Sequence, residues 1–313
     1  MLPIDEKYFP NFRQVQIEVE DGITINTFVG GEGAGKPALL LLHGHPETHL
    51  IWRFMTAELC KKYVVVITDL RGYGDSSKPE GLPDHSNYSK RAMADDQVKV
   101  MEHLGFKRFH VGGHDRGARV LHRMIMDHPE KIISCTLMDI VSTYDMYKET
   151  NQEFATKYWH WFFYIQGKGF PETCLSADPE RFINYNLNLK IGPAARKQFP
   201  KDVMDEYTRC FTYEEIHGIC EDYRASATID MELDEPDRHK KIQTPILLLW
   251  GANGVVGKLW DVVAKWQPLA ANIEGHAITQ CGHFVPEEQP QQVLDHMLAF
   301  MEKYKKQRNR SGG

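Results

Sequence analysis

A series of short, continuous apolar runs is the feature that most constrains how this 313-residue chain can fold. Runs that are apolar throughout are typical of strands buried on both faces of a parallel sheet. Helical patterns separate them, for example over Ser89–Leu104 and Arg116–His128. The repeated strand–helix–strand order predicts an α/β fold around a mainly parallel sheet. The runs that we assign to strands are Ala38–Leu42, Tyr63–Ile67, Phe109–Val111, Ile132–Leu137 and Ile246–Trp250.

The two ends of the chain have different patterns. Val15–Val19 and Ile23–Val29 alternate between apolar and polar residues around Asp21-Gly22, which is typical of a two-residue hairpin turn. We therefore expect antiparallel strands at the start of the fold. The pattern of Gln289–Tyr304 predicts a closing helix.

Residues 142–230 interrupt the strand–helix rhythm. They are rich in aromatic residues and show helical patches without a clear buried strand. The strand pattern restarts after Thr244-Pro245. We therefore predict one sheet domain, formed by residues 1–141 and 231–313, with an inserted helical domain at residues 142–230.

Composition and charge exclude several classes of partner. The formal net charge is -6, and the basic residues are spread out except in a short tail at residues 305–310, so nucleic acid is not an expected partner. The six cysteines have neither a C-x-x-C pair nor the spacing of a zinc site, which is typical of free thiols in the cytoplasm. Neither a signal peptide nor an apolar run of membrane-spanning length is present, so we expect no membrane partner and a cytoplasmic location.

The segment Gly113-His114-Asp115-Arg116-Gly117 lies between a predicted strand and a predicted helix. Small residues two before and two after a central side chain permit the sharp turn that lifts a nucleophile above a sheet. The central side chain here is the carboxylate of Asp115. The pattern predicts that Asp115 is a nucleophile; alternatively, it only caps the following helix, a position that aspartate favours.

Two further motifs lie where such a nucleophile needs them. His43–Pro46 follows an early strand, where the backbone N–H of His45 would form an oxyanion hole with the N–H of Arg116. His283 follows a short strand near the end of the chain, which is the expected place of the base. One histidine among 15 is weak evidence alone, but the ordered combination of motifs is far more specific.

A third residue should orient the base. The strand that ends at Trp250 is followed by no acid before Asp261, whereas the preceding strand is followed directly by Asp139. Position and exclusion therefore select Asp139. Its alternative role is that of a cap or a solvated acid at the end of a strand.

These motifs resemble those of the fluoroacetate dehalogenases in the α/β-hydrolase superfamily. The resemblance covers nearly the whole chain and includes two motifs in the inserted region. It implies an α/β-hydrolase fold with a mostly parallel eight-stranded sheet, a helical cap at residues 142–230, and a homodimer. The segments that carry it are His43–Pro46, Gly113–Arg119, Trp159–Trp161, Cys220–Ala225 and Gly282–Phe284.

A carboxylate nucleophile suits displacement at a saturated carbon. Attack by Asp115 on a carbon that bears halide would give a covalent alkyl ester. His283, held by Asp139, would then activate water to attack the carbonyl of this ester. The N–H groups of His45 and Arg116 would stabilise the resulting oxyanion. This chemistry requires neither a metal nor an organic cofactor.

Arg116 and Arg119 are three residues apart, so both can lie on one side of the helix that follows Asp115. Cations at that end oppose the helix dipole, and a carboxylate substrate would relieve their repulsion. The resemblance implies that these arginines bind the carboxylate of a haloacetate. It also implies that the halide-binding residues are His160, Trp161 and Tyr223. Alternatively, the arginines pair with acids of the inserted domain, and the other three side chains only pack its interior.

Three positions depart from the family pattern. His45 stands where the family commonly has an aromatic side chain, Glu47 where an amide is usual, and Lys190 where relatives often carry tryptophan. These changes alter the size and charge of the pocket. They bear on the substrate range and on activity toward carbon–fluorine bonds.

The resemblance implies hydrolysis of a small anionic 2-haloacid, such as fluoroacetate, to glycolate and halide. An epoxide hydrolase is the alternative with the same Asp, His and Asp; it would need cap tyrosines, of which Tyr223 could be one. A haloalkane dehalogenase fits less well, because Arg116 stands where those enzymes typically have an indole donor. A third possibility is a non-catalytic protein that binds a small carboxylate.

Overall fold

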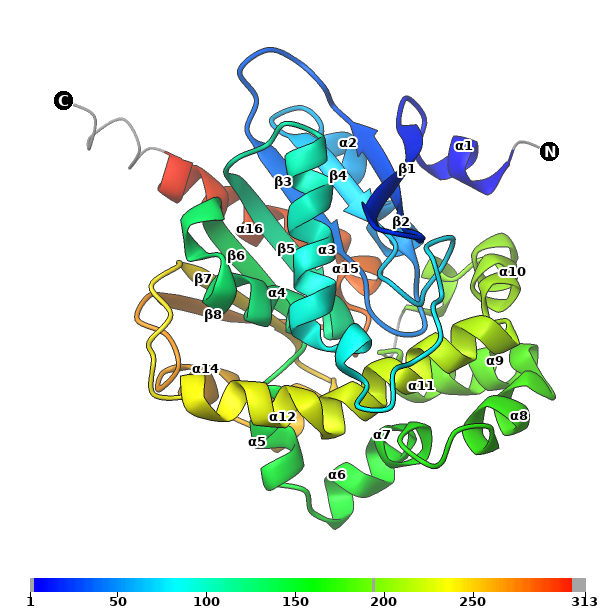
Figure 1. The fold of residues 1–313 in the computed structure, drawn as a ribbon. Helices are drawn as coiled ribbons and strands as arrows, with labels where there is room; N and C mark the ends of the chain where they lie inside the picture. Colours follow the sequence, from blue (N-terminus) through cyan, green and yellow to red (C-terminus); the bar gives the residue numbers. More distant parts are fainter. Residues whose placement is uncertain (1–2, 193–194, 306–313) are drawn as a thin grey trace.

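The eight strands form one sheet in the order β1-β2-β4-β3-β5-β6-β7-β8 (Figure 1). The structure is a computed structural model that describes residues 3–192 and 195–305, so residues 306–310 of the basic tail lie outside the described part. The strands are β1 (Arg13–Glu20), β2 (Ile23–Gly30), β3 (Ala38–Leu42), β4 (Val64–Thr68), β5 (Phe109–His114), β6 (Ile132–Met138), β7 (Ile246–Gly251) and β8 (Ile273–Ile278).

The pairing of the strands follows their apolar patterns. The continuous runs of β3 and β4 are buried at every position, and β3 to β8 pair in parallel. The alternating strands β1 and β2 pair antiparallel across a turn in which Gly22 has a φ of +74°. β2 also pairs antiparallel with β4. The predicted mostly parallel eight-stranded sheet is therefore confirmed.

Two strands differ from their sequence-based expectation. β5 continues beyond Val111 to His114, because Gly112 and Gly113 pair with β3 and β6. The predicted strand ended at Val111, since the two glycines give no apolar signal. β8 is the short strand expected before His283, but no bounds were predicted for it from the sequence, since it lies at the edge of the sheet and is only partly buried. Its residues Glu274 and His276 interrupt the apolar pattern.

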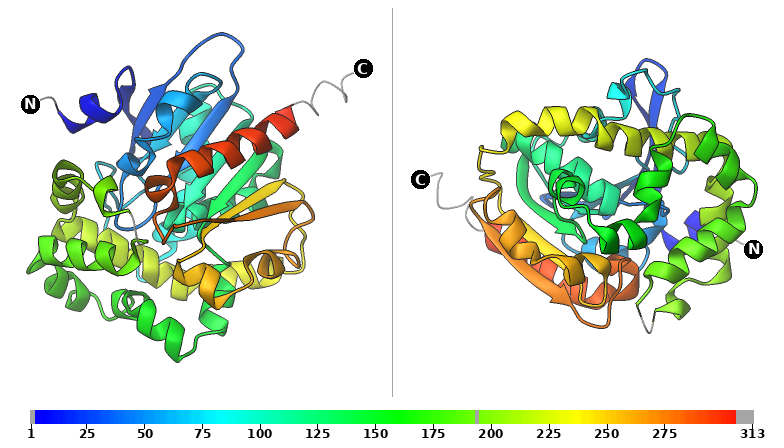
Figure 2. Two further views of the ribbon diagram at one scale, coloured as in Figure 1. Left: turned by 180° about the vertical axis from the view of Figure 1, so that it is seen from behind. Right: turned by 90° about the horizontal axis from the view of Figure 1, so that it is seen from below.

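Helices cover both faces of the sheet. The helices α3 (Lys90–His103) and α4 (Asp115–Asp127) pack together on one face, where α4 contacts β5 and β6. On the other face lie α16 (Pro290–Lys305), α2 (Thr56–Leu59) and α15 (Val285–Glu288) (Figure 2). The helices α3, α4 and α16 agree with the predicted ones to within one residue at each end, whereas α2 and α15 were not predicted. No described helix has the length and apolar character needed to cross a membrane.

The described residues between β6 and β7 form helices and no named strand. Figure 1 shows these helices gathered at one end of the sheet. The predicted boundary at residue 230 falls inside α12. The helices are α5 (Thr143–Lys148), α6 (Gln152–Lys157), α7 (Trp159–Tyr164), α8 (Phe170–Ser176), α9 (Pro179–Lys190), α10 (Lys201–Cys210), α11 (Tyr213–Ala227) and α12 (Ile229–Asp234).

The register of the parallel strands aligns their carboxyl ends. Leu42 at the end of β3 pairs with Gly113 of β5, and His114 pairs with Met138 of β6. The loops that follow these three strands therefore begin side by side. His45, Asp115 and Asp139 follow these three strands, whereas His283 follows β8.

Candidate active site

Asp115 lies at the sharp turn between β5 and α4. Its φ of +44° is in the left-handed region that L side chains rarely adopt. The turn is tight: a Cβ atom on Gly117 would lie 2.4 Å from the carbonyl oxygen of His43, and one on Gly113 would lie 2.8 Å from the carbonyl carbon of Gly117. The helix cap residue is His114, so Asp115 does not occupy the capping position of α4. This geometry is typical of a nucleophile elbow.

The structure brings His283, Asp139 and Asp115 together. The Nδ1 of His283 is 2.6 Å from Oδ2 of Asp139, and its Nε2 is 3.9 Å from Oδ2 of Asp115. The other oxygen of Asp139 accepts a hydrogen bond from the N–H of Gly251 at 3.1 Å, which fixes this carboxylate. All three side chains are buried. The imidazole therefore lies between the two carboxylates.

The charges of these groups depend on one another. Burial alone would lower the pKa of His283, but the carboxylates of Asp115 and Asp139 raise it to about 9. Burial would raise the pKa of Asp115, but His283, Arg119 and Arg116 hold it well below its usual range. Near neutral pH the arrangement contains an ionised Asp115 beside an imidazolium.

The backbone N–H groups of His45 and Arg116 are the candidates for an oxyanion hole. The N–H of His45 donates to Oδ2 of Asp115 at 3.3 Å. Arg116 is the second residue of α4, where backbone N–H groups have no acceptor within the helix. The oxyanion hole formed by these two N–H groups stays a prediction.

Arg116 is fully buried and pairs with an acid of the inserted helices. Its Nε donates to Oδ2 of Asp222 on α11 at 2.8 Å, and its Nη2 donates to Oδ1 of Asp222 at 2.7 Å. Asp222 also pairs with Lys90 and accepts from the hydroxyl of Tyr73. Pairing with a cap acid, the alternative considered from the sequence, is therefore present for Arg116. Its Nη1 is buried without a hydrogen-bond partner among the described residues.

Arg119 has no carboxylate partner among the residues that the structure describes. Its Nη1 donates to the carbonyl of Val141 at 3.1 Å and to the hydroxyl of Thr143 at 3.0 Å, and its Nη2 contacts the sulfur of Met146. Its Nε is buried and unpartnered within the described part of the chain. Burial lowers the pKa of Arg119 to about 10, against the attraction of Asp115. Arg119 therefore carries the less compensated charge of the two arginines.

The predicted halide-binding side chains lie on the inserted helices and are buried. The guanidinium of Arg116 is 4.0 Å from the ring centre of Tyr223, and that of Arg119 is 4.7 Å from the ring of Trp161. The Nε1 of Trp161 and the hydroxyl of Tyr223 have no hydrogen-bond partner among the described side chains and backbone groups. His160 is different, because its Nε2 is 3.3 Å from Nζ of Lys190.

The sequence did not identify all residues around this arrangement. Asp222 lies in the motif Cys220–Ala225, and its carboxylate was the feature that could have identified it as a partner of an arginine. The hydroxyl of Tyr164 lies 2.8 Å from Nε2 of His45, and the rings of Tyr164 and Tyr223 are 4.9 Å apart. Nothing in the sequence pattern separated Tyr164 from its aromatic neighbours.

Glu47 is buried behind the nucleophile elbow. One of its oxygens lies 3.3 Å from Nδ1 of His114, whose Nε2 lies 2.8 Å from the carbonyl oxygen of His283. Burial would lower the pKa of His114, but the charge of Glu47 raises it. The Glu47 carboxylate therefore forms an ion pair with His114, the residue before Asp115.

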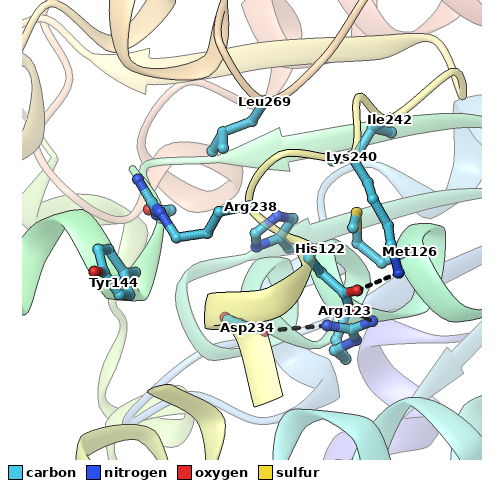
Figure 3. Close-up of a pocket in the computed structure, with 11 residues that line it drawn as sticks. His122, Arg123, Met126, Tyr144, Asp234, Arg238, Lys240, Ile242 and Leu269 are labelled. Carbon is cyan, nitrogen blue, oxygen red and sulfur yellow. Dashed lines mark hydrogen bonds and ion pairs between the residues drawn. The ribbon is translucent and has the colours of Figure 1, made fainter. Parts of the chain in front are cut away.

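A separate pocket lies beside the second half of α4 (Figure 3). Its lining includes Arg123, Asp234, Asp237 and Lys240. Arg123 lies 3.2 Å from Asp234, and Lys240 lies 2.7 Å from Asp237, so these cations are paired with acids. None of the predicted site residues lines this pocket. We place the candidate active site at Asp115, because Asp139 and His283 lie next to it there.

Comparisons with known proteins agree with this geometry. The alpha/beta hydrolase fold model matches residues 37–290. A fluoroacetate dehalogenase from Burkholderia sp is 42% identical over 294 residues, covering 94% of this chain and 95% of the relative. A soluble epoxide hydrolase from Corynebacterium sp. (strain C12) is 30% identical, covering 86% of this chain and 91% of the relative.

A solved structure gives the same result. A protein from Nostoc sp PCC 7120 described as an alpha/beta hydrolase has a TM-score of 0.90 and 46% sequence identity, covering 94% of this chain and 99% of that chain. These matches confirm the resemblance drawn from the motifs, the predicted fold and the prediction of a hydrolase. The chain belongs to the family of the alpha/beta hydrolase fold.

Proposed function

We propose that this protein is a haloacetate dehalogenase, which hydrolyses a small 2-haloacid such as fluoroacetate to glycolate and halide. The observation that carries this proposal is the pair of buried arginines beside the nucleophile. Arg116 and Arg119 each have a buried nitrogen without a hydrogen-bond partner among the described residues. An anionic substrate would satisfy both and would lie within reach of Asp115. The 42% identical fluoroacetate dehalogenase supports the same substrate class.

The first step is a displacement at carbon. An oxygen of the Asp115 carboxylate forms a bond to the halogen-bearing carbon, and the halide leaves with the electron pair of the broken bond. The arginines hold the substrate carboxylate, while Trp161 and Tyr223 offer N–H and O–H donors. Burial and the charge of Asp115 raise the pKa of the Tyr223 hydroxyl well above its usual range. This hydroxyl therefore stays protonated and can donate.

The second step is hydrolysis of the ester. Formation of the ester removes the charge of Asp115, one of the two carboxylates that raise the pKa of His283. The imidazolium can then lose its proton to solvent and act as a base toward water. The imidazole takes a proton from water as the hydroxide adds to the ester carbonyl, and the N–H groups of His45 and Arg116 stabilise the oxyanion. Its collapse breaks the bond to the glycolate oxygen, which takes the proton from His283, and restores the Asp115 carboxylate.

The helices of residues 142–230 act in this proposal as a cap over the core of residues 1–141 and 231–313. They supply the proposed halide donors and Asp222, which holds Arg116. A homodimer and a cytoplasmic location remain predictions from the resemblance and the cysteine content. Light scattering during size-exclusion chromatography would distinguish a dimer from the 36.1 kDa monomer.

One observation favours an epoxide hydrolase as the second candidate. Tyr164 lies next to Tyr223, and such an enzyme would use a pair of cap tyrosines to protonate the opened oxygen. However, the hydroxyl of Tyr164 already lies within hydrogen-bond distance of His45. A neutral epoxide would also leave the unpartnered nitrogens of Arg116 and Arg119 without an anion.

The test is incubation of the purified protein with fluoroacetate, chloroacetate and styrene oxide, with halide and diol measured separately. We expect halide release and no diol. Diol without halide would indicate an epoxide hydrolase, and binding of a small carboxylate without turnover would indicate a non-catalytic protein.

The ester intermediate needs its own test. In a single turnover in heavy-oxygen water, the label should enter Asp115 and be absent from the first glycolate. His283→Asn should accumulate the ester on Asp115, and Asp115→Asn should release no halide initially. Label in the first glycolate would exclude the ester.

A further inference from the structure

Lys190 is a buried lysine without a counter-ion in the described part of the chain. Its side chain is buried, and its Nζ contacts Nε2 of His160 at 3.3 Å and lies 5.8 Å from the ring centre of Tyr158. Among the described residues it forms no ion pair with a carboxylate. Burial of an unpaired ammonium costs several kcal/mol, so a lysine in this situation is a candidate for a functional role.

The backbone around Lys190 is tied to the base. Lys190 ends α9, and its carbonyl accepts a hydrogen bond from the N–H of His283 at 3.0 Å. A Cβ atom on Gly282 would lie 2.3 Å from this carbonyl oxygen, so the two segments are in close contact. One oxygen of Glu288 accepts from the N–H groups of both Gly192 and Gly282, each at 2.8 Å. The position of Lys190 relative to His283 is therefore fixed by the fold.

The ammonium lies among the groups of the proposed active site. The acids whose charges act on it are Asp115, Glu47 and Asp139. Burial lowers the pKa of Lys190 to about 8, although these acids counteract it. The titratable groups around it, from both the core and the inserted helices, are His45, Glu47, Asp115, Asp139, Tyr158 and His160.

The contact with Lys190 fixes the hydrogen bonding of His160. A protonated lysine has three donors and no acceptor, so Nε2 of His160 must accept from it. His160 is neutral, because burial and the charge of Lys190 hold its pKa well below the usual range. Nε2 of His160 therefore cannot also donate to a halide. Lys190 keeps two N–H donors after this contact, in addition to the unpartnered donors of Trp161 and Tyr223.

We propose that Lys190, acting in the dehalogenation proposed above, contacts the departing halide in place of His160 and sets the preference of the site among halides. During displacement the negative charge moves from the carboxylate of Asp115 to the halide. An ammonium held near both stabilises that charge throughout the step. Fluoride is small and accepts hydrogen bonds most strongly, so its departure depends on this cation more than the departure of bromide does.

Halide binding tests this inference without turnover. Wild type, Lys190→Met and Lys36→Met are titrated with sodium bromide by calorimetry. Lys36 is the matched control, because its Nζ donates to the carbonyls of Gly31 and Cys60, outside the proposed site. We expect bromide affinity to fall at least about tenfold in Lys190→Met and to be unchanged in Lys36→Met. Equal bromide affinity in wild type and Lys190→Met would overturn the role of Lys190.

A turnover ratio separates this role from a structural one. We expect Lys190→Met to lower the kcat for fluoroacetate by about 100-fold, and the kcat for bromoacetate by much less. Loss of both rates by the same factor would contradict the inference. If wild type releases halide from no haloacetate, the proposed function fails, while the bromide titration still decides the role of Lys190.

Lys190→Arg keeps a cation and provides a test that does not depend on the methionine variant. Lys190 is protonated below pH 8 and loses its proton above it. The bromide affinity of wild type should therefore fall as the pH rises through 8, and that of Lys190→Arg should not. Identical pH profiles for the two proteins would overturn the inference.

Discussion

Arg116 and Arg119 are one helical turn apart but have unequal electrostatic surroundings. The charge of Arg116 is balanced by Asp222, whereas Arg119 contacts a carbonyl, a hydroxyl and a sulfur atom. A substrate carboxylate would therefore gain more from Arg119. This difference assigns most of the anion recognition in the proposed function to one residue.

Arg119→Met should raise the KM for chloroacetate by about 10- to 100-fold with a smaller effect on kcat. The reason is that a carboxylate contact is made in both the bound substrate and the transition state. Steady-state halide release measures both constants. Chloroacetamide, which has no carboxylate, is the control and should show little change. An unchanged KM for chloroacetate would refute this role of Arg119.

At the scale of the elements, a residue outside the proposed site also holds helices together. Arg123 on α4 is buried and pairs with Asp127 at the end of its own helix, with Asp234 at the end of α12 and with Asp237 (Figure 3 shows its contact with Asp234). It therefore joins the core helix to the segment that returns from the inserted helices to β7. Three acids around one buried guanidinium make its loss costly.

Arg123→Met should lower the free energy of unfolding by about 2 kcal/mol, because it leaves Asp234 without an ion-pair partner among the described residues and removes one of the cations that contact Asp127 and Asp237. Arg91→Met is the matched control: Arg91 also contacts Asp127 but is 39% exposed, so its loss should cost less than about 1 kcal/mol. Urea unfolding curves of both variants give these values. Equal losses would show that burial of Arg123 does not decide the outcome.

At the scale of the whole molecule, a buried histidine links the N-terminus to the sheet. His49 lies after β3, with its Nδ1 2.9 Å from Asp69 after β4 and its Nε2 2.9 Å from Asp5 in α1 (Ile4–Tyr8). Burial would lower the pKa of His49, but the charges and hydrogen bonds of the two acids raise it to about 10. The folded protein therefore holds this proton more tightly than the unfolded chain does.

A raised pKa in the folded state stabilises the protein below the unfolded value of 6.5, and this contribution disappears as the pH rises through 10. The unfolding free energy of wild type should therefore fall between pH 7 and 10 more steeply than that of His49→Gln. A rise of one in the pKa of His49 on folding corresponds to at most about 1.4 kcal/mol of unfolding free energy. Urea unfolding at several pH values measures both slopes, and parallel slopes would contradict the assignment to His49.

The sequence predicted the sheet well because buried parallel strands leave continuous apolar runs. It also predicted that Asp115, Asp139 and His283 lie close together, since the carboxyl ends of parallel strands lie at one edge of the sheet. It gave pairing of the arginines with acids of the inserted domain only as an alternative and did not identify Asp222, and it did not predict that Lys190 would contact His160. These contacts join side chains that are 106 and 30 residues apart, and no periodic pattern records them.

The position of Asp222 restricts how the molecule can open. This carboxylate of α11 balances Arg116 of α4 and also Lys90 of α3. Lifting α11 from the core would leave two cations without their shared counter-ion, at a cost of several kcal/mol. We therefore expect α11 to stay in place in the proposed reaction, with substrate and product exchanged through movement of other helices of residues 142–230.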